Sequence, residues 1–292
     1  MKIIVCIKQV PNTTEIKIDP ITNTLKRDGV PSIINPDDKT AIEAALQLKE
    51  KCGATVTVLT MGPTQAEKAL REALAMGADE AYLLTDRAFA GSDTLATSTI
   101  IAAAIRKLGA DLVFCGRQAI DGDTAQVGPQ ISEHLGIPQI TYAAAIDYDA
   151  ARETLIVKRQ FEDRYQTLEV RGQCLVTILS TLDQPRYMNV WDIVNQDEKE
   201  IGIITFADLD VKKEDIGLGG SPTKVKSTAT KQFYKTIETL ELDPETAAKT
   251  IVDALKARHL VYGGTDKWQR IFGYSANSVM AKSRMYLLSL SA

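Results

Sequence analysis

Short β-rich runs alternate with helical patterns across the first half of the chain, and this alternation constrains the fold most strongly. The runs are Lys2–Ile7, Thr55–Met61, Ala81–Leu84, Leu112–Cys115 and Gln139–Ala143. Between them apolar residues recur at helical spacing, as in Ile101, Ala104, Ile105 and Leu108. Strand–helix alternation predicts an α/β fold: a doubly wound, mostly parallel five-stranded sheet with helices on both faces.

The second half departs from this alternation. Leu155–Phe161 and Tyr165–Val170 predict a hairpin added to the sheet, and Leu175–Leu179 predicts a further strand. The stretch Ile16–Val30 predicts another excursion from the core. We therefore expect a nucleotide-binding α/β domain over residues 1–208, with a partner-recognition segment near residues 184–196.

From Asp210 the chain gathers Gly, Pro, Ser, Thr and Lys and loses its periodicity, which is typical of an extended arm. The arm is expected over residues 209–292 and contains one helical pattern, capped by Asp243. A lone helix cannot bury its own apolar stripe, so this one is expected to pack against another subunit.

In a parallel α/β sheet, ligands bind outside the carboxyl ends of the strands. Three polar connections meet at that rim: Gln9–Thr14, Thr60–Thr64 and Gly116–Gly128. The third connection holds glycines, two aspartates, an arginine and a threonine, a density beyond what a change of direction requires. It matches neither a Walker A loop nor a G-x-G-x-x-G fingerprint.

The chemistry of this connection predicts a nucleotide. Asp123 or Gly122 is placed to cap a helix from about Thr124 to His134, whose positive end favours an anion. Arg117, Thr124 and Gln126 suit phosphate oxygens, whereas Asp121 and Asp123 suit a ribose hydroxyl or backbone N–H groups. The alternative is a capped loop that binds nothing.

Composition and charge argue against several classes of function. A net charge of −4 over 292 residues does not indicate a nucleic-acid partner. The four cysteines form no CxxC pair, as expected of a reduced cytoplasmic chain, and no apolar run is long enough for a membrane span. His134 and His259 are the only histidines, so neither a histidine metal site nor a Ser-His-Asp triad is expected.

Five segments, in this order, resemble the β subunit of electron-transfer flavoproteins. They are VCIKQVPNT from Val5, NPDDKTAIEAALQLKE from Asn35, TMGP from Thr60, REALAMGADEAYLL from Arg71 and CGRQAIDGDTAQVGP from Cys115. The resemblance covers about Met1–Val194. It implies a heterodimer with a flavin-carrying α subunit, and a rim site that holds AMP in housekeeping members or a second FAD in electron-bifurcating members.

Carried over position by position, the resemblance implies a set of cofactor-binding residues. They are Cys6, Asn35, Pro36, Asp37, Asp38, Met61, Gly116, Arg117, Gln118, Ala119, Ile120, Asp121, Gly122, Asp123, Thr124, Ala125, Gln126 and Val127. Asp121-Gly122-Asp123-Thr124 and the segment Lys8–Thr13 resemble the bifurcating form, which favours FAD over AMP.

The implied function is electron bifurcation. NADH would give a hydride to the flavin on this subunit. One electron would pass to ferredoxin or flavodoxin, and the other, through the α-subunit flavin, to a dehydrogenase acting on an acyl-CoA or a similar substrate. The chain would be an electron-transfer subunit rather than a stand-alone enzyme, and no side chain is assigned as a catalytic acid or base. Arg159 and Arg164 beside the hairpin would reach a flavin edge or be solvated charges.

The segment Gln184–Val194 resembles the part of the family that recognises a partner dehydrogenase. Val190 takes the anchor position and Trp191 follows it. Burial of these side chains against the core is the alternative. Two other functions stay open: a housekeeping β subunit that binds AMP, and a nucleotide-binding module resembling universal stress proteins.

Overall fold

The computed structural model describes residues 1–12, 31–226 and 239–260. The chain divides into two compact units, Met1–Ala229 and Thr230–Ala292. The excursion expected at Ile16–Val30 and the aromatic residues near the C-terminus, such as Trp268 and Phe272, lie outside the described residues.

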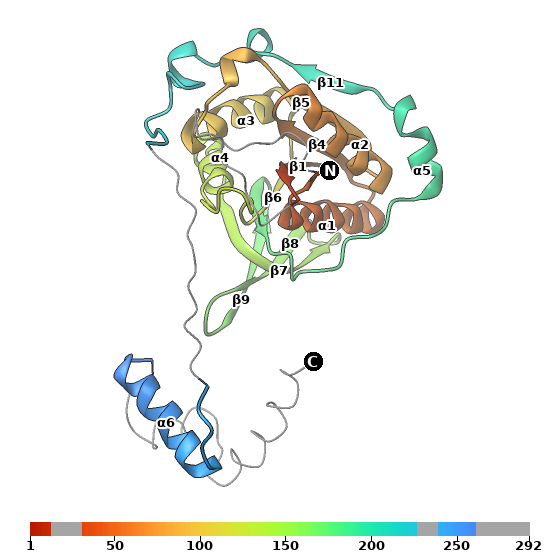
Figure 1. Cartoon of the computed structure of the whole chain (residues 1–292). Helices are drawn as coiled ribbons and strands as arrows, with labels where there is room; N and C mark the ends of the chain where they lie inside the picture. The colour runs from red at the N-terminus through yellow and green to blue at the C-terminus, as the bar shows by residue number, and fades with distance from the viewer. Residues whose placement is uncertain (13–30, 227–238, 261–292) are drawn as a thin grey trace. The chain divides into compact units, whose positions relative to one another are not determined.

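A nine-stranded sheet forms the centre of the first unit, in the order β11-β5-β4-β1-β6-β10-β7-β8-β9 (Figure 1). The pairs from β11 to β7 are parallel, and β8 and β9 add antiparallel strands at one end. The strands are β1 Lys2–Ile7, β4 Thr55–Met61, β5 Glu80–Leu84, β6 Leu112–Gly116, β7 Gln139–Asp149, β8 Thr154–Gln160, β9 Tyr165–Arg171, β10 Cys174–Ile178 and β11 Ile201–Ile204. Strands β2 Gln9–Pro11 and β3 Ser32–Ile34 form a separate antiparallel pair.

Helices cover both faces of the sheet. Buried residues of α1 (Pro36–Cys52) and α2 (Glu67–Met76) pack on one face with Ile3, Val5 and Ile7 of β1. Buried residues of α3 (Thr94–Leu108) and α4 (Val127–Leu135) pack on the other face with Ile4 and Cys6. The period-2 alternation of β1 thus supplies two apolar cores, which is the doubly wound arrangement (Figure 1).

Local sequence signals set the ends of the main helices. Pro36 begins α1, where a missing N–H costs nothing, and Gly53 ends it in the left-handed conformation with φ of 69°. The Asp93 carboxylate caps α3 by accepting hydrogen bonds from the Leu95 and Ala96 backbone N–H groups.

The doubly wound, mostly parallel α/β fold predicted from sequence is confirmed, with a larger sheet than the expected five strands. The hairpin β8–β9 continues the main sheet, and β10 lies between β6 and β7. Insertion of β10 is a non-local pairing, which hydrophobic periodicity along the chain does not reveal.

The segment after β11 packs against the start of α3. Ile216 is buried, and Ser221 Oγ accepts a hydrogen bond of 2.8 Å from the Asp93 N–H. Asp93 also accepts hydrogen bonds from the Thr223 N–H and hydroxyl. The loss of periodicity from Asp210 therefore coincides with an irregular but packed segment as far as Thr223.

The described part of the second unit contains α6 (Pro244–Ala257). Asp243 caps it as predicted, accepting from the Glu245 and Thr246 N–H groups at 3.1 Å. Its apolar residues Ile251 and Val252 are exposed. Among the described residues of the whole chain, no helix has the length and apolar character needed to cross a membrane.

Candidate functional site

The site residues predicted from sequence lie at the carboxyl ends of β1, β4 and β6. Cys6 of β1 is in register with Leu59 of β4 and with Cys115 of β6. Met61 ends β4, Gly116 ends β6, and Asn35–Asp38 lead into the first turn of α1. The parallel sheet therefore places these distant segments at one edge, called the rim site here.

Asn35 joins the start of α1 to the connection between β6 and α4, which is called the nucleotide loop (residues 116–127). Its Nδ2 donates to the Gln118 carbonyl at 2.8 Å, and its Oδ1 accepts from the Ile120 N–H at 3.0 Å. The side chain is fully buried and makes no capping bond to α1. Asn35 thus shapes the nucleotide loop rather than the helix.

Asp37 and Asp38 bind backbone groups from three strand ends. Asp38 accepts from the Lys8 N–H at 2.8 Å and from the Gly116 N–H at 3.0 Å. Asp37 accepts from the Ser180 N–H at 3.0 Å. The free end of α1 therefore carries two carboxylates of its own, and an external anion would be repelled there.

Side chains of the rim bind the two aspartates of the nucleotide loop. Lys8 Nζ lies 2.7 Å from Asp121 Oδ1, and Gln118 Nε2 donates to Asp123 Oδ1 at 2.9 Å. The pairing of Lys8 with Asp121 was not predicted from the sequence, although Lys8 lies in the segment VCIKQVPNT at the rim. The Lys8 ammonium therefore offsets the charge of Asp121, whereas Asp123 is hydrogen-bonded but stays a carboxylate.

The helix expected to start near Thr124 begins instead at Val127, so the expectation that Asp123 or Gly122 caps it is wrong. Asp123 and Ala125 have φ of 50° and 52°, in the left-handed region that non-glycine residues rarely adopt. The chain between them is therefore not helical, and the Asp123 carboxylate is directed to Gln118. Such strained residues cluster at ligand-binding sites.

The N-terminus of α4 differs from those of the other described α-helices. Among the described α-helices, only α4 has neither a capping side chain nor an acidic residue in its first turn. Its N-terminal N–H groups and dipole are therefore free to interact with a negative ligand. The N-terminus of α1 has acidic residues and that of α3 has a capping side chain, whereas that of α4 has neither.

Arg117 and Thr124 add donors to the same region. The Arg117 Nε is buried without a hydrogen bond to any described residue, and the nearest carboxylate oxygen, on Asp37, is 3.6 Å away. Thr124 is exposed. Gln126 accepts a hydrogen bond from the Thr94 hydroxyl at 2.9 Å, another contact that sequence analysis missed. A buried donor without an acceptor fits a ligand that brings oxygen atoms.

Two glycines of the nucleotide loop serve different purposes. A Cβ on Gly116 would lie 2.2 Å from Asp38 Oδ1, so only glycine fits there. A Cβ on Gly122 would meet no atom within 4 Å. Packing within the chain therefore requires glycine at position 116 but not at position 122. At Gly122 the loop borders open space.

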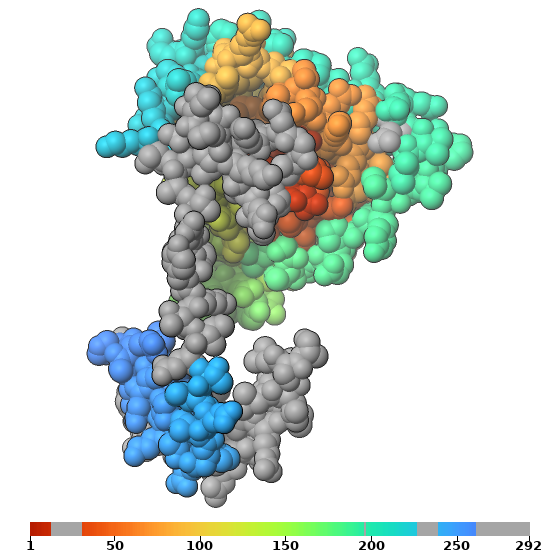
Figure 2. Space-filling model, in the orientation of Figure 1, coloured from red at the N-terminus to blue at the C-terminus, as the bar shows by residue number. Residues whose placement is uncertain are grey.

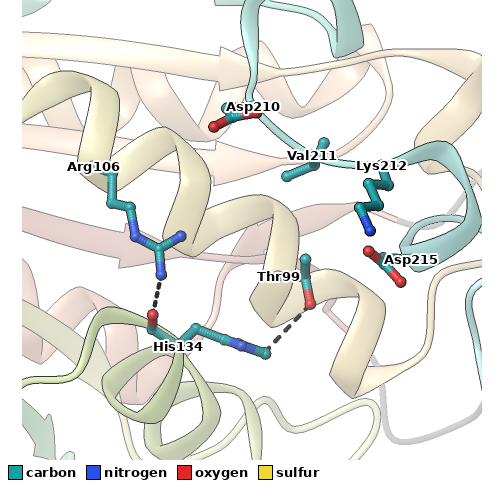
Figure 3. A pocket seen from close by; sticks show the side chains of 7 residues that line it. All are labelled: Thr99, Arg106, His134, Asp210, Val211, Lys212 and Asp215. Carbon is teal, nitrogen blue, oxygen red and sulfur yellow. Dashed lines mark hydrogen bonds between the residues drawn. The ribbon is translucent and has the colours of Figure 1, made fainter.

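A cavity of about 240 Å³ lies elsewhere, between α3, α4 and the segment after β11 (Figure 3). It contains none of the predicted site residues and is lined by Thr99, Arg106, His134, Asp210, Val211, Lys212 and Asp215. Arg106 donates to the His134 carbonyl, which satisfies the end of α4. Cations and carboxylates are mixed in it, so it favours no one charge of ligand.

The predicted partner segment lies on the surface of the first unit (Figures 1 and 2). Val190 and Trp191, in the short helix α5 (Val190–Asn195), are 75% and 74% exposed. The alternative that they are buried against the core is therefore wrong. Asn189 fixes α5 beside α2 through a hydrogen bond from its N–H to the Ala75 carbonyl. The exposed apolar side chains of α5 therefore project from a helix that is attached to α2.

The two hairpin arginines stack on one aromatic ring. The guanidinium groups of Arg159 and Arg164 lie 4.5 and 5.1 Å from the centre of the Phe161 ring. The Arg159 Nε is also buried without a hydrogen bond to any described residue. The Arg159 side chain is therefore fixed by its contacts but has one N–H donor, Nε, without an acceptor. Arg164 is largely exposed.

Comparisons with known proteins find similar sequences over most of the chain. Residues 22–208 match the electron transfer flavoprotein domain. The chain is 55% identical over 261 residues to an electron transfer flavoprotein subunit beta of Clostridium acetobutylicum, covering 89% of this chain and 100% of the relative.

Two further relatives belong to named complexes. A caffeyl-CoA reductase–Etf complex subunit, CarD of Acetobacterium woodii, is 54% identical, with 77% of this chain and 86% of the relative covered. An acryloyl-CoA reductase electron transfer subunit gamma of Anaerotignum propionicum is 45% identical, with 89% and 100% covered.

Proposed function

Since this chain belongs to the β subunits of the electron transfer flavoprotein family, we propose that its rim site binds FAD and that NADH delivers a hydride there. Bound FAD supplies the redox chemistry, because a flavin takes up two electrons together and releases them singly. The family membership decides against the alternative of a module resembling universal stress proteins.

The observation that carries the proposal is the uncapped N-terminus of α4 at the end of a nucleotide loop that has open space at Gly122. A diphosphate placed there would accept hydrogen bonds from helix N–H groups, as phosphates do at other helix N-termini. Arg117 and Thr124 would supply further donors. Asp37 and Asp38, although implied as cofactor-binding by the family resemblance, would act as the frame of the site because their oxygens already accept backbone hydrogen bonds.

The space beside the nucleotide loop favours FAD over AMP. AMP would satisfy the end of α4 equally well, so housekeeping electron transfer is the second candidate function. The smaller ligand would leave the region beside Gly122 empty, where a Cβ has no neighbour within 4 Å. We propose that the larger ligand extends from there toward the hairpin, where Arg159 holds an unused donor.

We further propose that the electrons separate at this subunit. One would pass to a low-potential acceptor, ferredoxin or flavodoxin, and the other to the α-subunit flavin and then to an acyl-CoA dehydrogenase. Relatives named for caffeyl-CoA and acryloyl-CoA reductases support an acyl-CoA partner. The exposed Val190 and Trp191 would dock on that dehydrogenase, and the exposed stripe of α6 on the α subunit. The four free cysteines suit a reducing cytoplasm.

NADH oxidation by the purified heterodimer with its dehydrogenase tests the proposal. Bifurcation predicts that oxidation requires both the low-potential carrier and the acyl-CoA acceptor in one mixture. Equal rates with the acyl-CoA acceptor alone would instead support the housekeeping function.

A further inference from the structure

Asp38 connects two segments of the rim site through a single buried carboxylate. One oxygen accepts from the Lys8 N–H at the end of β1, and the other accepts from the Gly116 N–H at the start of the nucleotide loop. Its side chain is 7% exposed. The close approach is possible because residue 116 is glycine, since a Cβ there would lie 2.2 Å from the carboxylate.

The two backbone positions that Asp38 binds lie next to side chains of the proposed ligand site. Lys8 carries the ammonium that pairs with Asp121, and Gly116 precedes Arg117 with its unused buried donor. A shift of either backbone would therefore move the positive groups of the site. Asp38 therefore sets the geometry of the ligand site together with Asn35, which holds the nucleotide loop further along.

Burial of Asp38 disfavours its ionised form relative to its protonated form. Burial raises the pKa of Asp38 to about 7, although the hydrogen bonds from Lys8, Asn35 and Gly116 lower it. Among the described residues, the other titratable groups that act on it are the Asp37 carboxylate on its own helix and the Cys115 thiol on β6, which in turn hydrogen-bonds the Cys6 thiol on β1. The Lys8 ammonium and the Arg117 guanidinium lie instead against Asp121 and Asp37.

We propose that Asp38, in its ionised form, is a positioning residue of the rim site and that its protonation weakens ligand binding. This inference rests on the proposed function in requiring a nucleotide at the loop. A carboxylate accepts both backbone N–H bonds at once. A protonated acid keeps a good acceptor on its carbonyl oxygen, but its hydroxyl oxygen is a weaker acceptor than a carboxylate oxygen, so one of the two connections is weakened.

Titration of the full-length chain with FAD at pH 5.5 and pH 8.5 tests the inference, because the FAD diphosphate carries the same charge at both values. Wild type should bind FAD roughly tenfold more weakly at pH 5.5, the effect of losing about one charged hydrogen bond. Asp38→Asn should bind weakly at both values, with no pH dependence of its own. The matched control Asp197→Asn, at an 88% exposed carboxylate, should behave as wild type.

Thermal unfolding at pH 8.5 separates positioning from a purely structural role. Because burial raises the pKa of Asp38, the fold disfavours its charged form at pH 8.5, so Asp38→Asn should not lower the Tm below that of wild type even though it lowers the FAD affinity. Wild-type affinity that is equal at the two pH values, or an Asp38→Asn variant that binds like wild type, would overturn the inference alone. A wild-type chain that binds no FAD at either pH would overturn the proposed function together with it.

Discussion

Arg186 forms a two-pronged ion pair with the buried carboxylate of Glu43. Its Nε lies 2.8 Å from Glu43 Oε2 and its Nη2 lies 2.9 Å from Oε1, while the Arg186 backbone N–H also donates to Oε2. Burial alone would raise the pKa of Glu43, but the hydrogen bonds from Arg186 and Gln47 outweigh it and lower the pKa below 4.5. This pair fastens the partner segment (residues 184–196) to α1.

Replacement of Arg186 should loosen the partner segment and destabilise the fold. Arg186→Ala leaves the buried Glu43 carboxylate without its cation, and we expect a loss of about 2 kcal/mol in the free energy of unfolding, measured by urea denaturation at pH 7. The contribution is present above the unfolded pKa of a glutamate and is lost as the pH falls through the lowered folded pKa. The difference between wild type and variant should therefore shrink below about pH 4.

The matched control for this variant is Glu50→Gln. Glu50 is the second carboxylate that Arg186 contacts, but its side chain is 62% exposed. Its replacement should change the unfolding free energy by less than about 1 kcal/mol, as for other exposed pairs. Equal losses for both variants would show that the buried pair has no special role.

Val190 is expected to be a docking residue for the dehydrogenase. Val190→Asp places a charge where an apolar pocket of the partner should be, so electron delivery to the dehydrogenase should fall at least tenfold with unchanged flavin content. Val190→Leu keeps an apolar anchor and should retain most of the rate. The control Ile203→Asp introduces the same charge at an exposed residue of β11 and should have no effect on delivery. Normal delivery by Val190→Asp would place the docking surface elsewhere.

Gly122 provides a test of ligand size. Because a Cβ there meets nothing within 4 Å, Gly122→Asp should change the free energy of unfolding by less than about 0.5 kcal/mol. A carboxylate in the space proposed for FAD should nonetheless reduce the FAD that copurifies with the heterodimer. Unchanged FAD content in this variant would show that the open space is not used.

Local signals predicted the elements that frame the rim site. The apolar runs of β1, β4 and β6 and the Pro36 and Gly53 boundaries of α1 depend on residues close in sequence, and the structure has them where they were expected. The same kind of local signal predicted the Asp243 cap of α6 in the second unit. The carboxyl ends of parallel strands then brought Cys6, Met61 and Gly116 to one edge.

Non-local packing decided the features that sequence did not predict. Asp123 is a favourable capping residue by type, but its left-handed backbone and its bond to Gln118 direct it elsewhere. Asp37 and Asp38 are ordinary residues for the first turn of a helix, and the sequence gives no sign that they are buried or bind three strand ends. The neighbours of β10 follow from tertiary packing alone.

The nucleotide content of the purified heterodimer tests the central claim most directly. After acid denaturation, the released nucleotides are separated and quantified against the protein. The account predicts two FAD and no AMP per heterodimer, with the second FAD held at the free end of α4 and the open space beside Gly122. One FAD and one AMP per heterodimer would contradict it and identify the chain as a housekeeping β subunit.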